Sequence, residues 1–114
     1  DLYDATVRGP MLDTPEFYRA CAATLREGGI MTVNLFGDHP SYEKNLKAMH
    51  PAFAEVLCLP PVHEGNVVAL AFKDKPALDF PALYERAEQI RAQTRMPAKS
   101  WVNGLKNGWD EAHA

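Results

Sequence analysis

The sequence predicts an α/β fold in which helices and strands alternate along a chain of 114 residues. Two observations carry this prediction. Short apolar runs rich in β-branched residues are bounded by glycine or proline, as in buried strands. The stretches between them place apolar residues three or four positions apart, as in amphipathic helices. The predicted order is helix, strand, helix, strand, strand, helix, which leaves a thin and incomplete sheet.

The first helix is predicted to begin after Thr14, which can cap it, with Pro15 in the first helical position. Gly28-Gly29 is expected to end it, because glycine adopts a left-handed conformation without a Cβ penalty. The strand Ile30–Phe36 follows directly. Its nearly continuous apolar character predicts burial on both faces, as in a parallel sheet.

The second helix is predicted to start at Ser41, as a candidate cap, and to stop at Pro51. Two further strands are expected, over Phe53–Leu59 and Val67–Phe72. The segment between them is too short for a parallel crossover, so this pair is predicted to be an antiparallel hairpin.

An amphipathic helix is predicted over Asp79–Gln93, and it completes an α/β portion over residues 1–94. Residues 95–114 are predicted to form a weakly helical tail, broken at Asn107-Gly108 and frayed at its end. With three strands and one antiparallel pair, the apolar strand edges need a cover, so a homo-oligomer is expected.

Composition excludes several classes of function. A net charge of −3 and the absence of a basic cluster argue against nucleic-acid or membrane surfaces. The four histidines show no metal-ligand spacing, so no metal is expected. Cys21 and Cys58 form no Cys-x-x-Cys pair and are predicted to be buried thiols, which favours a cytoplasmic protein.

The first ten residues carry two carboxylates, Asp1 and Asp4, in a loop that closes on Gly9-Pro10. In loops of this kind an aspartate commonly satisfies backbone amides, and the residue pattern alone favours that role. Phe17-Tyr18, at the start of the first helix, are predicted to belong to the core rather than to a site.

These landmarks together resemble the spermidine synthase (polyamine aminopropyltransferase) family over Asp1 to Phe72. The family has an Asp-x-x-Asp loop ending in Gly-Pro, a Phe-Tyr pair opening the next helix, and a Leu-x-x-Gly-Gly-Ile turn, matched by 25–30. Its last hairpin has a proline-bearing turn closed by glycine, matched by 60–65. The resemblance implies the C-terminal part of a Rossmann-like, methyltransferase-type fold.

The resemblance also implies an activity, the transfer of an aminopropyl group from decarboxylated S-adenosylmethionine to a polyamine. Asp1 would be the catalytic base, and Asp4 would bind the amine substrate. Pro10 would line the nucleoside of the cofactor. Glu64 would add negative charge opposite the loop, as a second substrate-binding residue.

Departures from the family leave alternatives open. Ala5 stands where the family has proline, and the amine-binding Tyr-Pro-Ser-Gly turn is here Val62-His63-Glu64-Gly65. There are two alternatives. The first is a methyltransferase-like protein that uses S-adenosylmethionine, and the second is a catalytically silent homologue that serves in assembly. Because the glycine-rich cofactor half is missing from these 114 residues, the isolated chain is expected to be inactive.

Overall fold

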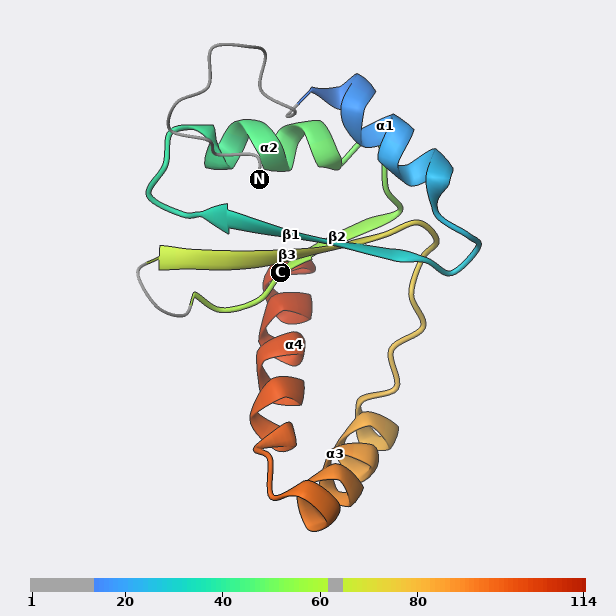
Figure 1. Ribbon diagram of the computed structural model, residues 1–114, viewed down its shortest axis with the longest axis vertical. Coiled ribbons are helices and arrows are strands. Elements are labelled where there is room, and N and C mark those ends of the chain that lie inside the picture. Colours follow the sequence, from blue (N-terminus) through green and yellow to red (C-terminus); the bar gives the residue numbers. More distant parts are fainter. Residues whose placement is uncertain (1–13, 62–64) are drawn as a thin grey trace.

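A computed structural model of the chain describes residues 14–61 and 65–114. In this part of the chain, four helices and three strands form an α/β structure (Figure 1). The order of elements agrees with the predicted alternation, with one additional helix at the end. The elements are α1 (Pro15–Thr24), β1 (Ile30–Phe36), α2 (Ser41–Met49), β2 (Glu55–Cys58), β3 (Asn66–Phe72), α3 (Phe80–Thr94) and α4 (Ala98–Ala112).

The sheet has the order β1-β3-β2, and β3 is antiparallel to both of its neighbours. The predicted β2–β3 hairpin is confirmed. The prediction that only one pair is antiparallel is wrong, because β3 inserts between β1 and β2. These two strands therefore run in the same direction without pairing, and α2 makes the crossover between them. β1, α2 and β2 form the predicted α/β repeat, but β3 lies between its two strands.

β1 is not buried on both faces, contrary to the prediction. Its residues alternate, with Leu35 fully buried and Ile30 50% exposed. The cause is its position: in the described part of the chain, β1 pairs with β3 alone and has helices on one face (Figure 1). An apolar run cannot reveal which of its residues lack a covering layer.

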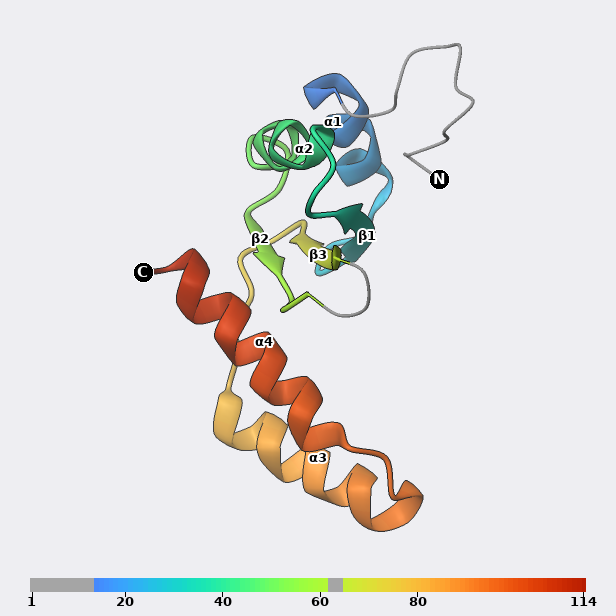
Figure 2. The same ribbon diagram turned by 90° about the vertical axis from the view of Figure 1, so that its left-hand side faces the viewer.

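The core lies between the sheet and the layer formed by α1 and α2 (Figures 1 and 2). Tyr18 of α1 is fully buried there, as predicted for a core residue, and Phe17 packs against the same cluster. The Tyr18 hydroxyl donates a hydrogen bond to Oδ1 of Asn45, which is also fully buried. Asn45 Nδ2 in turn donates to the Ser41 carbonyl at 2.9 Å. A polar link thus joins the two helices inside an apolar layer.

Substituting Tyr18→Phe removes the buried hydroxyl and keeps the ring. We expect the free energy of unfolding to fall by about 1–2 kcal/mol, because a hydrogen bond is lost where water cannot replace it. Urea unfolding followed by circular dichroism measures this. A control is Tyr84→Phe, whose hydroxyl bonds Asn103 at an exposed position and should matter little. Equal losses in the two variants would contradict the assigned role of the Tyr18–Asn45 link.

The helix starts follow the predicted caps with one correction. Thr14 Oγ1 accepts a hydrogen bond from Phe17 N at 3.1 Å, as predicted. Ser41 is the first residue of α2 rather than its cap, and its amide donates to His39 Nδ1 at 3.1 Å. Gly28 is left-handed, with φ of 77°, but α1 has already ended at Thr24, so this glycine serves the following turn.

The predicted weakly helical tail is instead the 15-residue helix α4, which runs through Gly104 and Gly108. Packing against β2 explains why Asn107-Gly108 does not break it. A Cβ at Gly108 would lie 2.4 Å from the Cys58 carbonyl oxygen, so the helix passes the strand at a distance that only glycine allows. The Asn107-Gly108 pair, which in the sequence suggests the end of a helix, is here the point where α4 packs closely against β2.

Helices α3 and α4 form an antiparallel hairpin that projects away from the sheet (Figure 2). Only the C-terminal part of α4 reaches β2, where His113 Nε2 lies 3.1 Å from Glu55 Oε1. The molecule is therefore elongated, with extents of 48 × 32 × 28 Å.

Candidate functional site

The four residues predicted for the site, Asp1, Asp4, Pro10 and Glu64, lie outside the described residues. Their predicted roles therefore stay predictions. One of them adjoins a described site in the sequence: Pro61 and Gly65 bound the segment that contains Glu64. Pro60 and Pro61, which precede this segment, line a pocket of the described molecule.

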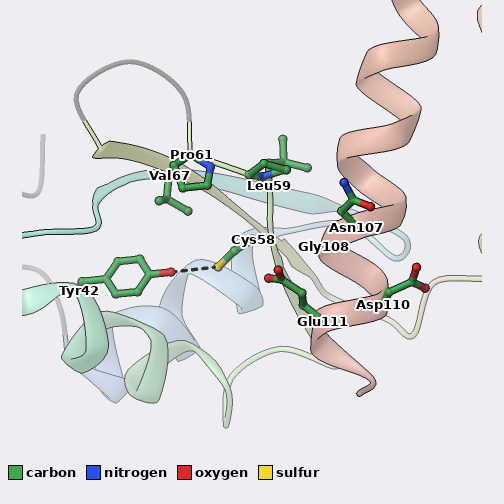
Figure 3. A pocket seen from close by; sticks show the side chains of 10 residues that line it. Tyr42, Cys58, Leu59, Pro61, Val67, Asn107, Gly108, Asp110 and Glu111 are labelled. Carbon is green, nitrogen blue, oxygen red and sulfur yellow. Dashed lines mark hydrogen bonds between the residues drawn. The ribbon is translucent and has the colours of Figure 1, made fainter.

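The pocket lies where the end of β2, α2 and α4 meet, and it has a volume of about 560 Å³ (Figure 3). This volume is within the range of small-molecule sites. Apolar side chains at the end of β2 and on β3 form one wall, and Tyr42 of α2 faces the polar residues of α4 across the pocket (Figure 3). The lining residues are Tyr42, Cys58, Leu59, Pro60, Pro61, Val67, Asn107, Gly108, Asp110 and Glu111.

Tyr42 and Cys58 meet inside this pocket, and the Tyr42 hydroxyl donates a hydrogen bond to Cys58 Sγ at 3.8 Å (Figure 3). Burial, together with this bond, raises the pKa of Tyr42 to about 12. Burial also raises the pKa of the Cys58 thiol, against the opposing effect of the Tyr42 hydrogen bond. Both groups are therefore neutral near pH 7, and the thiol is a poor nucleophile. The pair suits binding rather than covalent catalysis.

Alkylation by iodoacetamide tests this state of Cys58. Because the raised pKa lowers the thiolate fraction at a given pH, we expect Cys58 at pH 8 to react several-fold more slowly than a peptide cysteine. Mass spectrometry of the digested protein separates Cys58 from Cys21, whose pKa burial also raises. In urea both should react at the peptide rate. A native Cys58 that reacts as fast as the unfolded one would contradict the assignment.

The carboxylates of this pocket come from α4. Asp110 pairs with Lys106 Nζ at 3.3 Å, while the exposed Glu111 raises the pKa of both Tyr42 and Cys58 by its negative charge. Carboxylates beside an apolar wall can bind an aliphatic cation, because its ammonium ends make charge-assisted hydrogen bonds and its methylenes bury against carbon. The arrangement is chemically suited to an amine.

Sequence reasoning missed this pocket because it treated residues 95–114 as a tail. The sequence does place Asp110-Glu111 one helical turn after Asn107-Gly108. This spacing indicates a shared polar face only if the segment is helical, and it was expected to be a broken tail. Proximity to Cys58, some fifty positions earlier, has no local signature.

A second feature lies at the carboxyl end of β1. The Gly37 amide donates to the Gly65 carbonyl at 2.9 Å, and Gly65 is left-handed with φ of 79°. A Cβ at Gly65 would lie 3.1 Å from the Asp38 carboxylate. Gly65, the first described residue before β3, is thus tied to the loop after β1.

Residues 14–61 and 65–114 offer little other chemistry. No three or more His, Cys, Asp or Glu side chains are grouped to hold a metal ion there. No described helix combines the length and apolar character needed to cross a membrane. Cys21 and Cys58 are both free and half-buried rather than fully buried.

The described molecule is thus an α/β protein with a three-stranded antiparallel sheet, compatible with part of a Rossmann-like fold. The chain is similar to a polyamine aminopropyltransferase of Chromobacterium violaceum, with 28% identity over 97 residues. The match covers 83% of this chain and 37% of that protein, so the chain spans well under half of its relative. This similarity supports a spermidine-synthase-like relationship at the level of the family. No protein-family model matches the chain, and no solved structure matches it.

Proposed function

We propose that this chain is the C-terminal part of a transferase that moves an aminopropyl group from decarboxylated S-adenosylmethionine to a polyamine. The observation that carries the proposal is the 28% identity to a polyamine aminopropyltransferase over 97 residues. The ordered landmarks of the sequence, from the Asp-x-x-Asp loop to the last hairpin, agree with this similarity. The isolated chain is proposed to be inactive, and the whole protein to be cytoplasmic.

The proposed chemistry assigns one role to each predicted site residue. The carboxylate of Asp1 takes a proton from the substrate ammonium, which frees the nitrogen lone pair. That nitrogen attacks the carbon beside the sulfonium, the carbon–sulfur bond breaks, and its electron pair returns to sulfur to leave a neutral thioether. Asp4 and Glu64 hold the amine, and Pro10 lines the nucleoside.

The acidic wall of the pocket at the end of β2 supports an amine as the substrate class. Its apolar residues and the α4 carboxylates suit a chain of methylenes with charged ends. Pro61 is one of the apolar residues that line this pocket, and it lies three positions before Glu64 in the sequence. Substrate binding close to Glu64 is part of the proposal.

Isothermal titration of the complete protein that contains this segment tests the proposal. Binding of both putrescine and methylthioadenosine, with loss of putrescine affinity in Glu64→Gln, is the expected result. Binding of S-adenosylmethionine without any diamine would replace the proposal with a methyltransferase-like activity. Binding of none of the three would leave the catalytically silent homologue.

A further inference from the structure

The C-terminal end of α4 is where the α3–α4 hairpin packs on the sheet. α3 packs on α4 and α4 packs on β2, while the rest of the hairpin projects away from the sheet (Figure 2). The same end of α4 forms one wall of the pocket that Tyr42 and Cys58 line. A smaller pocket of about 220 Å³ shares these two residues with it and extends to Ala112. The contacts that hold this end of α4 therefore set the shape of both pockets.

His113, the residue that follows α4, makes the last of these contacts. Its Nε2 lies 3.1 Å from Oε1 of Glu55 on β2, and the Glu55 side chain is only 15% exposed. Its Nδ1 lies 2.8 Å from the carbonyl oxygen of Trp109. The imidazole ring also stacks on the Trp109 indole, with 3.8 Å between ring centroids and 29° between the planes. The side chain of His113 is thus fixed by two polar contacts and one ring contact.

Both ring nitrogens of His113 face oxygen atoms that only accept hydrogen bonds, a carbonyl and a carboxylate. A neutral imidazole has one N–H group, whereas an imidazolium has two, so only the protonated ring donates to both oxygens. The Glu55 charge, the face of the Trp109 indole and the negative end of the α4 dipole all attract that cation. When the proton leaves, one hydrogen bond and the ion pair are lost together.

Other titratable groups face this end of α4 from every element packed against it. They are Cys58 of β2, Tyr42, Glu43 and His50 of α2, and Asp110 and Glu111 of α4 itself. Burial raises the pKa of Tyr42 to about 12 and also raises the pKa of Cys58, so neither group becomes charged near pH 7. Carboxylates stay ionised between about pH 5.5 and 8, whereas imidazoles change charge there. Among these groups, His50 is therefore the one that titrates in the same range as His113.

We propose that Glu55, Trp109 and His113 form a pH-sensitive clasp that holds the end of α4 against β2 and narrows the pocket between α2, β2 and α4. At the acidic end of the imidazole range the ring is protonated and the clasp is closed. As the pH rises, the ring loses its proton and α4 beyond Gly108 is held less firmly. Access to the pocket, and to Cys58 within it, therefore increases with pH. The clasp acts on the wall of the pocket and does not depend on which ligand the pocket binds.

Alkylation of Cys58 by N-ethylmaleimide at about pH 5.5 and about pH 7.5, within the range where imidazole changes charge, tests this proposal. The quantity to compare is the native rate divided by the rate in urea at the same pH, because this ratio cancels the change in thiolate fraction. We expect the ratio to rise about two- to fivefold between these pH values, the size of effect that one partly exposed ion pair supplies. Cys21 on α1, measured in the same digest, should keep a constant ratio.

Two variants remove the clasp. His113→Gln has no titrating ring at the exposed end of α4, so its ratio should be the same at both pH values. Glu55→Gln keeps the size of the side chain but removes its charge, so the ratio at the lower pH should approach the wild-type value at the higher pH. His50→Gln is the matched control, because His50 lines the smaller pocket but takes no part in the clasp. This variant should keep the wild-type rise.

Circular dichroism establishes that each variant keeps its fold, and NMR of the His113 ring follows its protonation directly. A wild-type ratio that does not change with pH, or a rise that persists in His113→Gln, would overturn the proposal. So would a rise that is lost in His50→Gln, or one that occurs where the His113 ring keeps its charge.

Discussion

Leu35→Ala is expected to lower the free energy of unfolding by about 2–5 kcal/mol, the largest effect of any single substitution considered for this chain. Leu35 is fully buried in the core between the sheet and the α1–α2 layer, where it pairs with Val67 across β1 and β3. Truncation removes its apolar contacts and leaves a cavity in a layer held on both sides. For a domain with a stability of about 5–15 kcal/mol, this loss brings the folded state close to its limit.

Urea unfolding measures the effect as a lower midpoint concentration of urea, with the slope of the free energy against urea concentration unchanged. Ile30→Ala is the matched control, because Ile30 lies on the same strand but on its open face, with half of its surface exposed. We expect Ile30→Ala to cost less than about 1 kcal/mol. Similar losses in the two variants would mean that β1 does not have one buried and one open face.

Gly108→Ala is expected to destabilise the protein by about 1–3 kcal/mol, although alanine is the better helix former by about 1 kcal/mol. The new Cβ would stand 2.4 Å from the Cys58 carbonyl oxygen, and a backbone atom in a sheet cannot move aside. Helix α4 must therefore shift away from β2. Because Cys58 and Gly108 also line the pocket, the shift should open it and expose Cys58 to alkylation.

Gly104→Ala in the same helix is the control for this prediction. The nearest atom to its new Cβ would be Pro60 Cδ at 3.4 Å, an ordinary contact. Helix propensity should then dominate, so this variant should be neutral or more stable by up to about 1 kcal/mol. If both alanine variants stabilise the protein equally, the close packing of α4 on β2 is wrong.

Local patterns predicted the elements better than their arrangement. Ile30–Phe36 is a strand with the predicted bounds, because its β-branched run and flanking glycines act over a few residues. Its neighbour and its burial depend on β3, some thirty positions later, and no periodicity within β1 carries that information. The β2–β3 hairpin was predictable because the short connection leaves only one geometry.

The candidate site shows the same contrast between what local patterns predict and what depends on tertiary packing. The predicted carboxylates came from a motif, and Asp1, Asp4 and Glu64 fall outside the described residues. The described pocket is formed by Tyr42, Cys58 and the end of α4, which come together only through tertiary packing. Gly108 shows the limit most clearly, since the glycine that suggested the end of a helix is the residue that lets this helix approach the sheet.

The most direct test is a transfer assay on the complete protein that contains this segment, with decarboxylated S-adenosylmethionine and putrescine, read out by mass spectrometry. We predict equal amounts of methylthioadenosine and aminopropylated amine, and a loss of roughly 100-fold or more in Asp1→Asn. Asp74→Asn is the control, because Asp74 accepts a hydrogen bond from the Gly28 amide and has no role in the proposed chemistry. Absence of both products, or an Asp1→Asn variant as active as the wild type, would contradict the account.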